Sequence, residues 1–339
     1  MLELIGRKLL QNLPAEMAHD LSIKMLASRT SILVSTKQII NPIKLFGVEF
    51  ANPVGLAAGF DKNADALRGL SQLGFGFIEV GTVTPKAQKG NPKPRLFRLP
   101  KNQAIINRMG FNNKGVDYLV SQIEKFKPNG ILGINIGKNK TTANENAVED
   151  YIFCFKKVAH LADYVTVNIS SPNTIDLRQL QESKNLIQLL ESLKKAQIDL
   201  HKKTNKYTPI VVKIAPDQDI VTTKEMALNI QNSGIDGIIC TNTTIKKNNL
   251  KKENHRNQTG GLSGKPLLSR SNEIIRSVRE AVGDDFPIIG VGGILTDEDA
   301  MSKIRAGANL VQVYTGFIYQ GTQLIKAINN KLIVQTRRK

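Results

Sequence analysis

Residues 164–174 read YVTVNISSPNT, and this stretch joins a strand signal to a cluster of polar side chains. Its first four residues are apolar, aromatic or β-branched, which is typical of a buried strand. Pro172 lacks a backbone N–H and should end that strand, so a serine and two asparagines lie at its carboxyl end. Because α/β folds place ligand sites and catalytic groups at that end of their strands, Asn168, Ser171 and Asn173 are candidate site residues.

Apolar runs of this kind occur eight times along the chain, and each is followed by a segment that can form a helix. Most are continuous rather than alternating, as in parallel strands that are covered on both faces. Eight βα repeats predict an α/β fold, a (β/α)8 TIM barrel, with a doubly wound open sheet as the alternative. The runs are 54–58 (VGLAA), 77–81 (FIEVG), 131–136 (ILGINI), 164–169 (YVTVNI), 210–215 (IVVKIA), 237–241 (GIICT), 287–291 (PIIGV) and 310–314 (LVQVY).

Two connections between these runs are too long for ordinary βα loops. One spans roughly 82–114 and contains two short apolar segments on either side of residues 100–102, which predicts a β-hairpin. The other spans 242–269 and is rich in Lys, Asn and Gly. Because both follow strands, we expect both on the barrel face that carries the site, as lids or binding loops.

The composition excludes several classes of protein. No apolar run reaches the roughly 18 residues of a membrane-spanning helix, and the N-terminus does not resemble a signal peptide. Two cysteines and four scattered histidines give neither a disulfide framework nor metal-ligand spacing, so no metal site is expected. The net charge of +18 suggests an anionic partner, either a membrane surface, nucleic acid or small anions, and is equally explained by solubility.

Residues 1–40 stand apart from the repeats as an N-terminal extension of two short amphipathic helices, separated by Pro14. Composition alone favours a helical pair that caps the barrel floor with its apolar stripe buried. Residues 41–339 would then form the barrel domain. The apolar stripe comprises Leu2, Ile5, Leu9 and Leu13 on the first helix and Met17, Leu21 and Met25 on the second, with basic Arg7, Lys8 and Lys24 beside it.

Residues 168–174 resemble the active-site segment of the dihydroorotate dehydrogenases, and the resemblance extends over nearly the entire chain. In that family the residue at the Ser171 position is the catalytic base, a serine in the quinone-dependent, membrane-associated class and a cysteine in the soluble class. Serine here therefore implies the quinone-dependent class. In that class a two-helix N-terminal extension forms the quinone entrance at the membrane. The resemblance therefore favours a quinone entrance over a structural cap as the role of residues 1–40.

The resemblance implies one flavin mononucleotide (FMN) per chain. Lys213 also stands out without it, because a lysine inside a buried strand is costly unless it is paired. Glycine-rich turns after the last two strands suit a phosphate, whereas no P-loop and no Rossmann glycine motif follows a strand. The residues that the resemblance assigns to FMN are Ala58, Gly59, Phe60, Asp61, Lys62, Thr82, Asn135, Asn168, Lys213, Thr241, Gly264, Gly293, Tyr314 and Thr315.

Several amide side chains at strand ends suggest a site that binds a flat, polar heterocycle. Residues 107–111 (NRMGF) resemble the family's orotate-binding loop, with donors that match a carboxylate and an amide edge. The resemblance assigns substrate contacts to Lys62, Asn107, Arg108, Met109, Gly110, Phe111, Asn168, Asn173, Asn242 and Thr243.

Ser171 has no histidine near it in sequence, so a hydrolase triad is not indicated. A serine that merely caps a helix starting near Thr174 is the structural alternative. By resemblance, Ser171 takes the C5 proton of (S)-dihydroorotate while hydride leaves C6 for the flavin, with Thr174 and Phe111 flanking the proton relay. The product is orotate, the electron acceptor is a membrane quinone, and the reaction is the fourth step of pyrimidine (UMP) biosynthesis.

Two other functions remain open. One is a soluble, fumarate- or NAD-linked enzyme of the same family, against which Ser171 and the N-terminal helices count. The other is an RNA-acting flavin barrel such as a tRNA-dihydrouridine synthase, which the positive charge allows. That family's catalytic cysteine motif and RNA-binding appendage are missing, so no nucleic-acid partner is expected. The expected location is the cytoplasmic face of the cell membrane, held peripherally by an anionic surface.

Overall fold

The computed structural model describes residues 6, 10–28, 31, 35–174, 176–248 and 250–336. Eight parallel strands form a closed barrel, in the order β10-β12-β13-β3-β4-β7-β8-β9. All eight predicted runs are strands, and the last pairs with the first, Val311 opposite Val54. The (β/α)8 barrel is therefore confirmed, and the open sheet is excluded. The strands are β3 (Val54–Leu56), β4 (Phe77–Val83), β7 (Ile131–Ile136), β8 (Tyr164–Asn168), β9 (Ile210–Ile214), β10 (Gly237–Cys240), β12 (Ile288–Val291) and β13 (Leu310–Val313).

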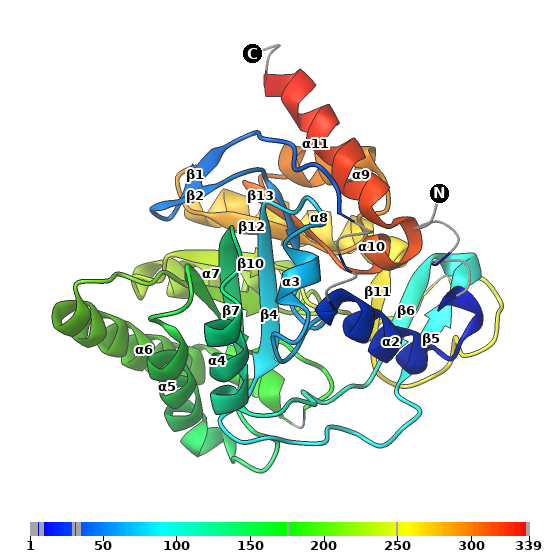
Figure 1. Ribbon diagram of the computed structural model, residues 1–339. Helices are drawn as coiled ribbons and strands as arrows, with labels where there is room; N and C mark the ends of the chain where they lie inside the picture. Colours follow the sequence, from blue (N-terminus) through cyan, green and yellow to red (C-terminus); the bar gives the residue numbers. More distant parts are fainter. Residues whose placement is uncertain are drawn as a thin grey trace.

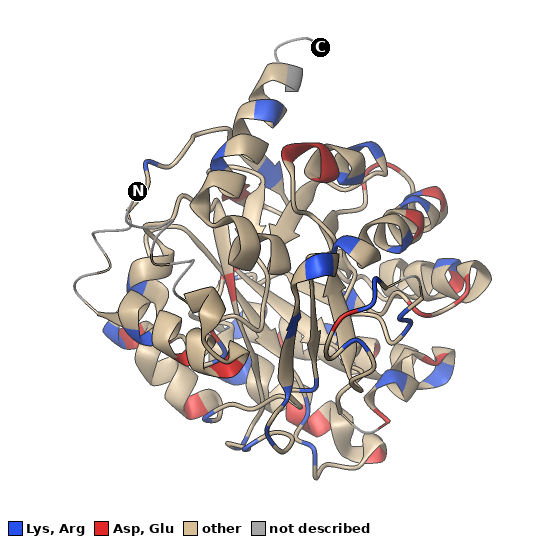
Figure 2. Cartoon of the chain, turned by 90° about the vertical axis from the view of Figure 1, so that its right-hand side faces the viewer, with Lys and Arg blue, Asp and Glu red and all other residues tan. Residues whose placement is uncertain are grey.

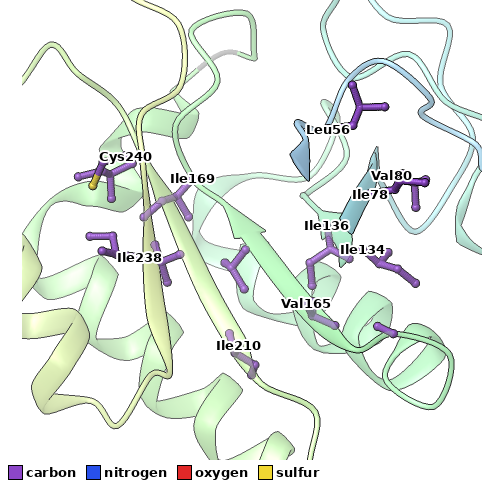
Figure 3. Close-up of a cluster of buried hydrophobic side chains, with 14 of the residues drawn as sticks. Leu56, Ile78, Val80, Ile134, Ile136, Val165, Ile169, Ile210, Ile238 and Cys240 are labelled. Atoms are coloured by element: carbon purple, nitrogen blue, oxygen red, sulfur yellow. The ribbon is translucent and has the colours of Figure 1, made fainter. Parts of the chain in front are cut away.

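Alternate residues of each strand belong to two different hydrophobic clusters, because successive side chains of a strand point to opposite faces. In β9, Val212 packs with the helices, whereas Val211 belongs to the cluster inside the barrel. Figure 3 shows part of the outer cluster, where Ile134 and Ile136 of β7 lie near Val165 of β8. The continuous apolar runs in the sequence result from this burial on both faces.

Helices follow the strands and surround the barrel (Figure 1). Between them, short 3-10 helices lie at η2 (Pro100–Asn102), η3 (Asn144–Asn146), η4 (Leu177–Gln181) and η5 (Lys265–Leu267). The α-helices after the first strand are α3 (Leu67–Leu70), α4 (Val116–Lys125), α5 (Ala147–Val158), α6 (Ser183–Thr204), α7 (Ile220–Asn232), α8 (Leu268–Val282), α9 (Asp297–Arg305), α10 (Thr315–Gln320) and α11 (Thr322–Thr336).

A small hairpin, β1 (Ile43–Leu45) and β2 (Val48–Phe50), covers the amino end of the barrel. Phe50 is fully buried there, with its ring centroid 5.1 Å from Phe77 and 6.4 Å from Tyr164, the first residues of two barrel strands. The opposite, carboxyl end stays available for the site.

The two long connections meet in one three-stranded sheet at that carboxyl end. The first connection forms the predicted hairpin, β5 (Leu96–Leu99) and β6 (Ala104–Asn107), with η2 between the strands. The second connection contributes β11 (Gly261–Gly264), which pairs with β6 and places Gly261 opposite Asn107. This third strand was not predicted from the sequence.

The second predicted N-terminal helix is α2 (Ala15–Ala27), which contacts β5 and α3 (Figure 1). Glu16 forms an ion pair with Arg95 at 2.8 Å, and both side chains are largely buried. Met17 and Leu21 remain exposed on the outer face. Leu2, Ile5, Arg7, Lys8 and Leu9 lie outside the described residues. No described helix combines the length and the hydrophobicity that crossing a membrane requires.

Candidate active site

A cavity opens at the carboxyl ends of the barrel strands, where the sequence places its polar residues. Its wall comes from seven strands and the residues directly after them, and its roof comes from the segment after β6 and from β11. Of the predicted site residues, those that line the cavity are Ala58, Gly59, Lys62, Thr82, Asn107, Met109, Gly110, Phe111, Asn168, Ser171, Asn173, Lys213, Thr241, Asn242, Thr243, Gly264, Gly293, Tyr314 and Thr315.

Lys213 projects from β9 into the cavity, and only 5% of its surface is exposed. Among the described residues, its ammonium group forms no hydrogen bond and no ion pair. Burial lowers the pKa of Lys213, while the negative charge of Glu79, which lies inside the barrel on β4, acts in the opposite direction. A buried cation without a direct partner indicates that the cavity takes a ligand with an acceptor or negative charge at this point.

A chain of hydrogen bonds runs below the cavity and fixes its amide groups. Asn135 donates to the Glu79 carboxylate at 2.8 Å, and the Thr82 hydroxyl donates to the Asn135 carbonyl oxygen at 2.5 Å. Asn168 donates to the Thr82 hydroxyl oxygen at 3.0 Å, and Asn242 donates to the Asn168 carbonyl oxygen at 3.3 Å. Three strands, β4, β7 and β8, and the segment after β10 thereby hold these polar side chains in one arrangement.

Ser171 lies just beyond β8 on the cavity wall, with 5% of its surface exposed. Its hydroxyl oxygen accepts the backbone N–H of Asn173 at 3.3 Å, which closes a turn. The next helix, η4, starts only at Leu177. The hydroxyl therefore supports a turn rather than a helix cap. The hydroxyl of Thr174 is buried and has no partner among the described residues.

The roof is tied to the wall by amide groups. The Asn173 side chain donates to the Asn107 carbonyl oxygen at 3.1 Å, and the Asn91 side chain donates to the backbone oxygen of Asn173 at 3.1 Å. Lys62 donates to the backbone oxygen of Gly59 at 2.8 Å on the same wall. Burial and the nearby positive charge of Arg95 lower the pKa of Lys62 to about 8.

Four predicted site residues do not line this cavity. Asp61 accepts three backbone N–H groups of the turn that follows β3, the shortest from Ala66 at 2.7 Å. The Asn135 side chain lies between Glu79 and Thr82 and forms hydrogen bonds to both. Arg108 points away, with its guanidinium group 4.7 Å from the Phe97 ring and a hydrogen bond to Gln258 at 2.9 Å. Phe60 lines a neighbouring cavity.

That neighbouring cavity is largely apolar, has a volume of about 410 Å³ and lies between α2 and the barrel. It is within the size range of small-molecule sites. Ala18 and His19 of α2 line it together with Phe60 and Phe317, and Tyr314 lines both cavities. Burial lowers the pKa of His19 to about 3, so the imidazole is neutral at physiological pH. The shared Tyr314 makes the two cavities adjacent.

The sequence did not reveal other lining residues, among them Gln312 and Leu267. Gln312 is fully buried, and its carbonyl oxygen has no partner among the described residues. A signal was present for Gln312 and for Glu79, since each is a polar residue within an apolar run. Their inward direction depends on strand register, which the sequence leaves open.

The backbone around the cavity leaves no room for side chains at three glycines. A Cβ at Gly316 would lie 2.0 Å from the backbone oxygen of Ile294, and one at Gly293 would lie 2.4 Å from the Cα of Leu268. At Gly264 it would lie 2.3 Å from the backbone oxygen of Gln103. These turns let the backbone N–H groups approach a ligand closely, as phosphate sites after the last two strands of barrels do.

Together, the closed barrel, the polar cavity at its carboxyl end and the glycine turns define a (β/α)8-barrel enzyme. A sequence model of the family "dihydroorotate dehydrogenase" matches residues 42–335. The chain therefore belongs to the dihydroorotate dehydrogenase family.

Similar proteins support this at the level of the whole chain. Dihydroorotate dehydrogenase (quinone) from Saccharophagus degradans is 52% identical over 323 residues, covering 94% of this chain and 95% of its own. The enzyme of the same name from Pseudoalteromonas atlantica is 51% identical, covering 97% of this chain and 99% of its own. The structure of DHODH from Eimeria tenella with ferulenol has a TM-score of 0.89 at 38% identity, covering 95% of this chain and 92% of its own.

Proposed function

We propose that this chain oxidises (S)-dihydroorotate to orotate with quinone as the electron acceptor, as the fourth step of pyrimidine biosynthesis. The observation that carries the proposal is the cavity in which Ser171, Lys213 and the amides of Asn168, Asn173 and Asn242 face one another. A hydroxyl that can take part in proton removal, a buried cation and several amides are groups that suit the binding and oxidation of a polar heterocycle. The matched relatives named for the quinone reaction support it.

FMN, one per chain, fits this cavity. The unpaired Lys213 ammonium suits the flavin ring, and the tight turns at Gly264 and Gly293 suit a phosphate. The chemistry that FMN supplies when bound is acceptance of a hydride equivalent and its release as electrons to quinone. The residues proposed to hold it are Ala58, Gly59, Lys62, Thr82, Asn168, Lys213, Thr241, Gly264, Gly293, Tyr314 and Thr315, with Phe60, Asp61 and Asn135 supporting them from behind the cavity wall.

The substrate is proposed to lie between the roof and the floor of the cavity. Asn107 of the roof and Asn173 of the wall bond to each other beside this space at 3.1 Å, so their remaining amide groups can bind the edge of a heterocycle. Thr243 offers a buried hydroxyl that has no partner among the described residues. The proposed contacts are Lys62, Asn107, Met109, Gly110, Phe111, Asn168, Asn173, Asn242 and Thr243, with Arg108 as a support of the roof.

Ser171 is the proposed base. Departure of hydride from C6 makes the C5 proton of dihydroorotate acidic, and the Ser171 hydroxyl receives that proton as the C5–C6 double bond of orotate forms. Ser171 is held by Asn173, and the buried Thr174 hydroxyl can extend a proton path away from it. No histidine or carboxylate is bonded to Ser171 among the described residues, so its proton must leave through solvent or through such a path.

Quinone is proposed to enter through the apolar cavity beside α2. Tyr314 lines this cavity as well as the polar one, so a quinone bound here would lie beside the proposed flavin. The exposed Met17 and Leu21 give α2 an apolar outer face that suits the surface of a membrane. Basic and acidic residues are interspersed over this side of the molecule (Figure 2), and the exposed apolar face of α2 favours a membrane surface over nucleic acid as the partner. The proposed location is peripheral, on an anionic membrane surface at its cytoplasmic face.

One experiment tests the function directly. Purified protein should be yellow, and its flavin absorbance should bleach on anaerobic addition of dihydroorotate and recover on addition of a quinone. Protein that carries flavin yet is not bleached by dihydroorotate would overturn the proposed substrate. Bleached protein that recovers with fumarate or NAD, and not with quinone, would overturn the proposed acceptor.

A further inference from the structure

Glu79 is a fully buried carboxylate in the middle of β4, and three strands supply donors to it. Asn135 of β7 donates to one carboxylate oxygen at 2.8 Å. Tyr164 of β8 and Gln312 of β13 donate to the other oxygen at 2.9 and 2.7 Å. The ring of Tyr164 reaches this position because Gly133 is opposite, where a Cβ would lie 2.3 Å from that ring.

Three side chains donate to the two oxygens of Glu79, so Glu79 acts as an acceptor in all three hydrogen bonds, and this fixes the direction of each bond beyond it. Asn135 must present its NH2 group to Glu79, so its carbonyl oxygen faces Thr82. The Thr82 hydroxyl must then donate to Asn135, and its oxygen is left to accept the NH2 group of Asn168. Each amide side chain in this series of hydrogen bonds therefore has one orientation.

The last members of this chain lie on the cavity wall. Because Asn168 turns its NH2 group towards Thr82, its carbonyl oxygen accepts the Ser170 hydroxyl at 3.1 Å and Asn242 at 3.3 Å. Gln312 likewise gives its NH2 group to Glu79, which leaves its carbonyl oxygen without a partner on the cavity wall. An amide turned over at any of these positions would exchange a donor for an acceptor where a ligand binds.

We propose that Glu79 is a positioning residue: as a pure acceptor inside the barrel, it sets the donor and acceptor directions of Asn168, Asn242 and Gln312 on the cavity wall. Glu79 itself does not line the cavity. The inference rests on the proposed function only for the choice of FMN and orotate as probes.

The first test compares Glu79→Gln with Tyr164→Phe as a matched control. Glutamine at position 79 can keep its carbonyl oxygen towards Tyr164 and Gln312, but its NH2 group then meets the NH2 group of Asn135. The Asn135 amide must then rotate by about 180°, and the donor and acceptor directions of the hydrogen bonds from Asn135 to Asn168 are no longer fixed. Tyr164→Phe also removes a hydrogen bond to Glu79. It leaves the Glu79 carboxylate and the hydrogen bonds that lead from it through Asn135 to Asn168 intact.

Glu79→Gln should bind orotate about tenfold more weakly than wild type, a change of about 1.4 kcal/mol that is on the scale of one misplaced hydrogen bond. It should also retain less FMN per chain after purification. Tyr164→Phe should have a lower melting temperature but an orotate Kd within about twofold of wild type. Equal orotate Kd and FMN content in Glu79→Gln and wild type would overturn the inference, as would equal losses in both variants.

A second variant restores the direction of the bonds with the carboxylate moved from position 79 to position 135. In the double variant Glu79→Gln/Asn135→Asp, the NH2 group of glutamine donates to the new carboxylate, whose other oxygen again accepts the Thr82 hydroxyl. Orotate binding and FMN content should recover towards wild type. A folded double variant that binds orotate as weakly as Glu79→Gln would overturn the inference. Wild-type protein that binds neither probe would instead refute the proposed function.

Discussion

The backbone N–H of Asn173 donates to the hydroxyl oxygen of Ser171 at 3.3 Å, two residues away in the same turn. This bond holds the serine side chain against the cavity wall and leaves its second lone pair and its proton free to act. Ser171 also stands at the junction of the strand β8 and the loop that carries Asn173, so a single turn positions the proposed base and a proposed substrate contact.

Ser171→Ala should slow flavin bleaching by dihydroorotate about 100-fold or more, the scale of general-base catalysis. Orotate binding should stay largely intact because the turn loses only a weak hydrogen bond. In wild type, the bleaching rate should rise between pH 6 and 9, since a serine needs help to lose its proton. Stopped-flow absorbance and orotate titration measure both effects. Bleaching at the wild-type rate in Ser171→Ala would exclude Ser171 as the base.

Lys213→Ala should lose bound flavin, lower the flavin reduction potential, or both, because the ammonium group stabilises negative charge in a cavity of low dielectric constant. FMN content by absorbance and redox titration measure these properties. Lys224→Ala is the matched control, since Lys224 forms an exposed ion pair with Glu280. Full flavin occupancy at an unchanged potential in Lys213→Ala would contradict the assignment.

Lys303 should make the protein more stable as the pH rises from 7 to 9. It is fully buried in α9, it forms no ion pair with the residues that the structure describes, and it donates to Ser271 at 2.9 Å and to Asn272 at 3.0 Å. Burial lowers its pKa from 10.5 to about 7. Over this window the folded state holds fewer protons than the unfolded state, so the free energy of unfolding rises with pH, by about 2 kcal/mol from this group.

Lys303→Met removes that contribution, so its melting temperature should rise less than that of wild type between pH 7 and pH 9. Other groups, such as Lys62, titrate in the same window in both proteins, so the difference between the two isolates Lys303. Parallel melting curves at the two pH values would mean that Lys303 keeps an ordinary pKa in the folded protein.

Deletion of residues 1–40 should abolish reduction of a long-chain quinone and binding to anionic liposomes, while dihydroorotate still bleaches the flavin. The polar cavity lies from Ala57 onward, whereas α2 forms one wall of the apolar cavity. The milder variant Met17→Ser/Leu21→Ser should weaken liposome flotation alone. Leu228→Ser, an exposed leucine on α7, is its control. Full quinone activity in the truncated protein would contradict a role of α2 in quinone access and would leave α2 with a structural role alone.

The barrel could be predicted because its strands are buried on both faces and therefore appear as continuous apolar runs. β11 could not, because its sequence GLSG has little strand propensity and pairs only where β6 offers an open edge. The side-chain direction of Arg108 was equally inaccessible, since it depends on Gln258, which is distant in sequence. Glu79 was visible as a carboxylate in an apolar run, but its partners come from three other strands.

The pairing of β6 with β11 sets an order of events for a chain as it leaves the ribosome. Gly261 lies opposite Asn107, so the roof of the cavity cannot form until the ribosome has synthesised both strands. Barrel closure waits longer still, because Val54 pairs with Val311 near the end of the chain. Contacts of such sequence separation form slowly, because long loops must close first. The apolar strands of the nascent protein therefore lack their final partners until the last repeat has been synthesised, and they have to be kept from aggregating during that time.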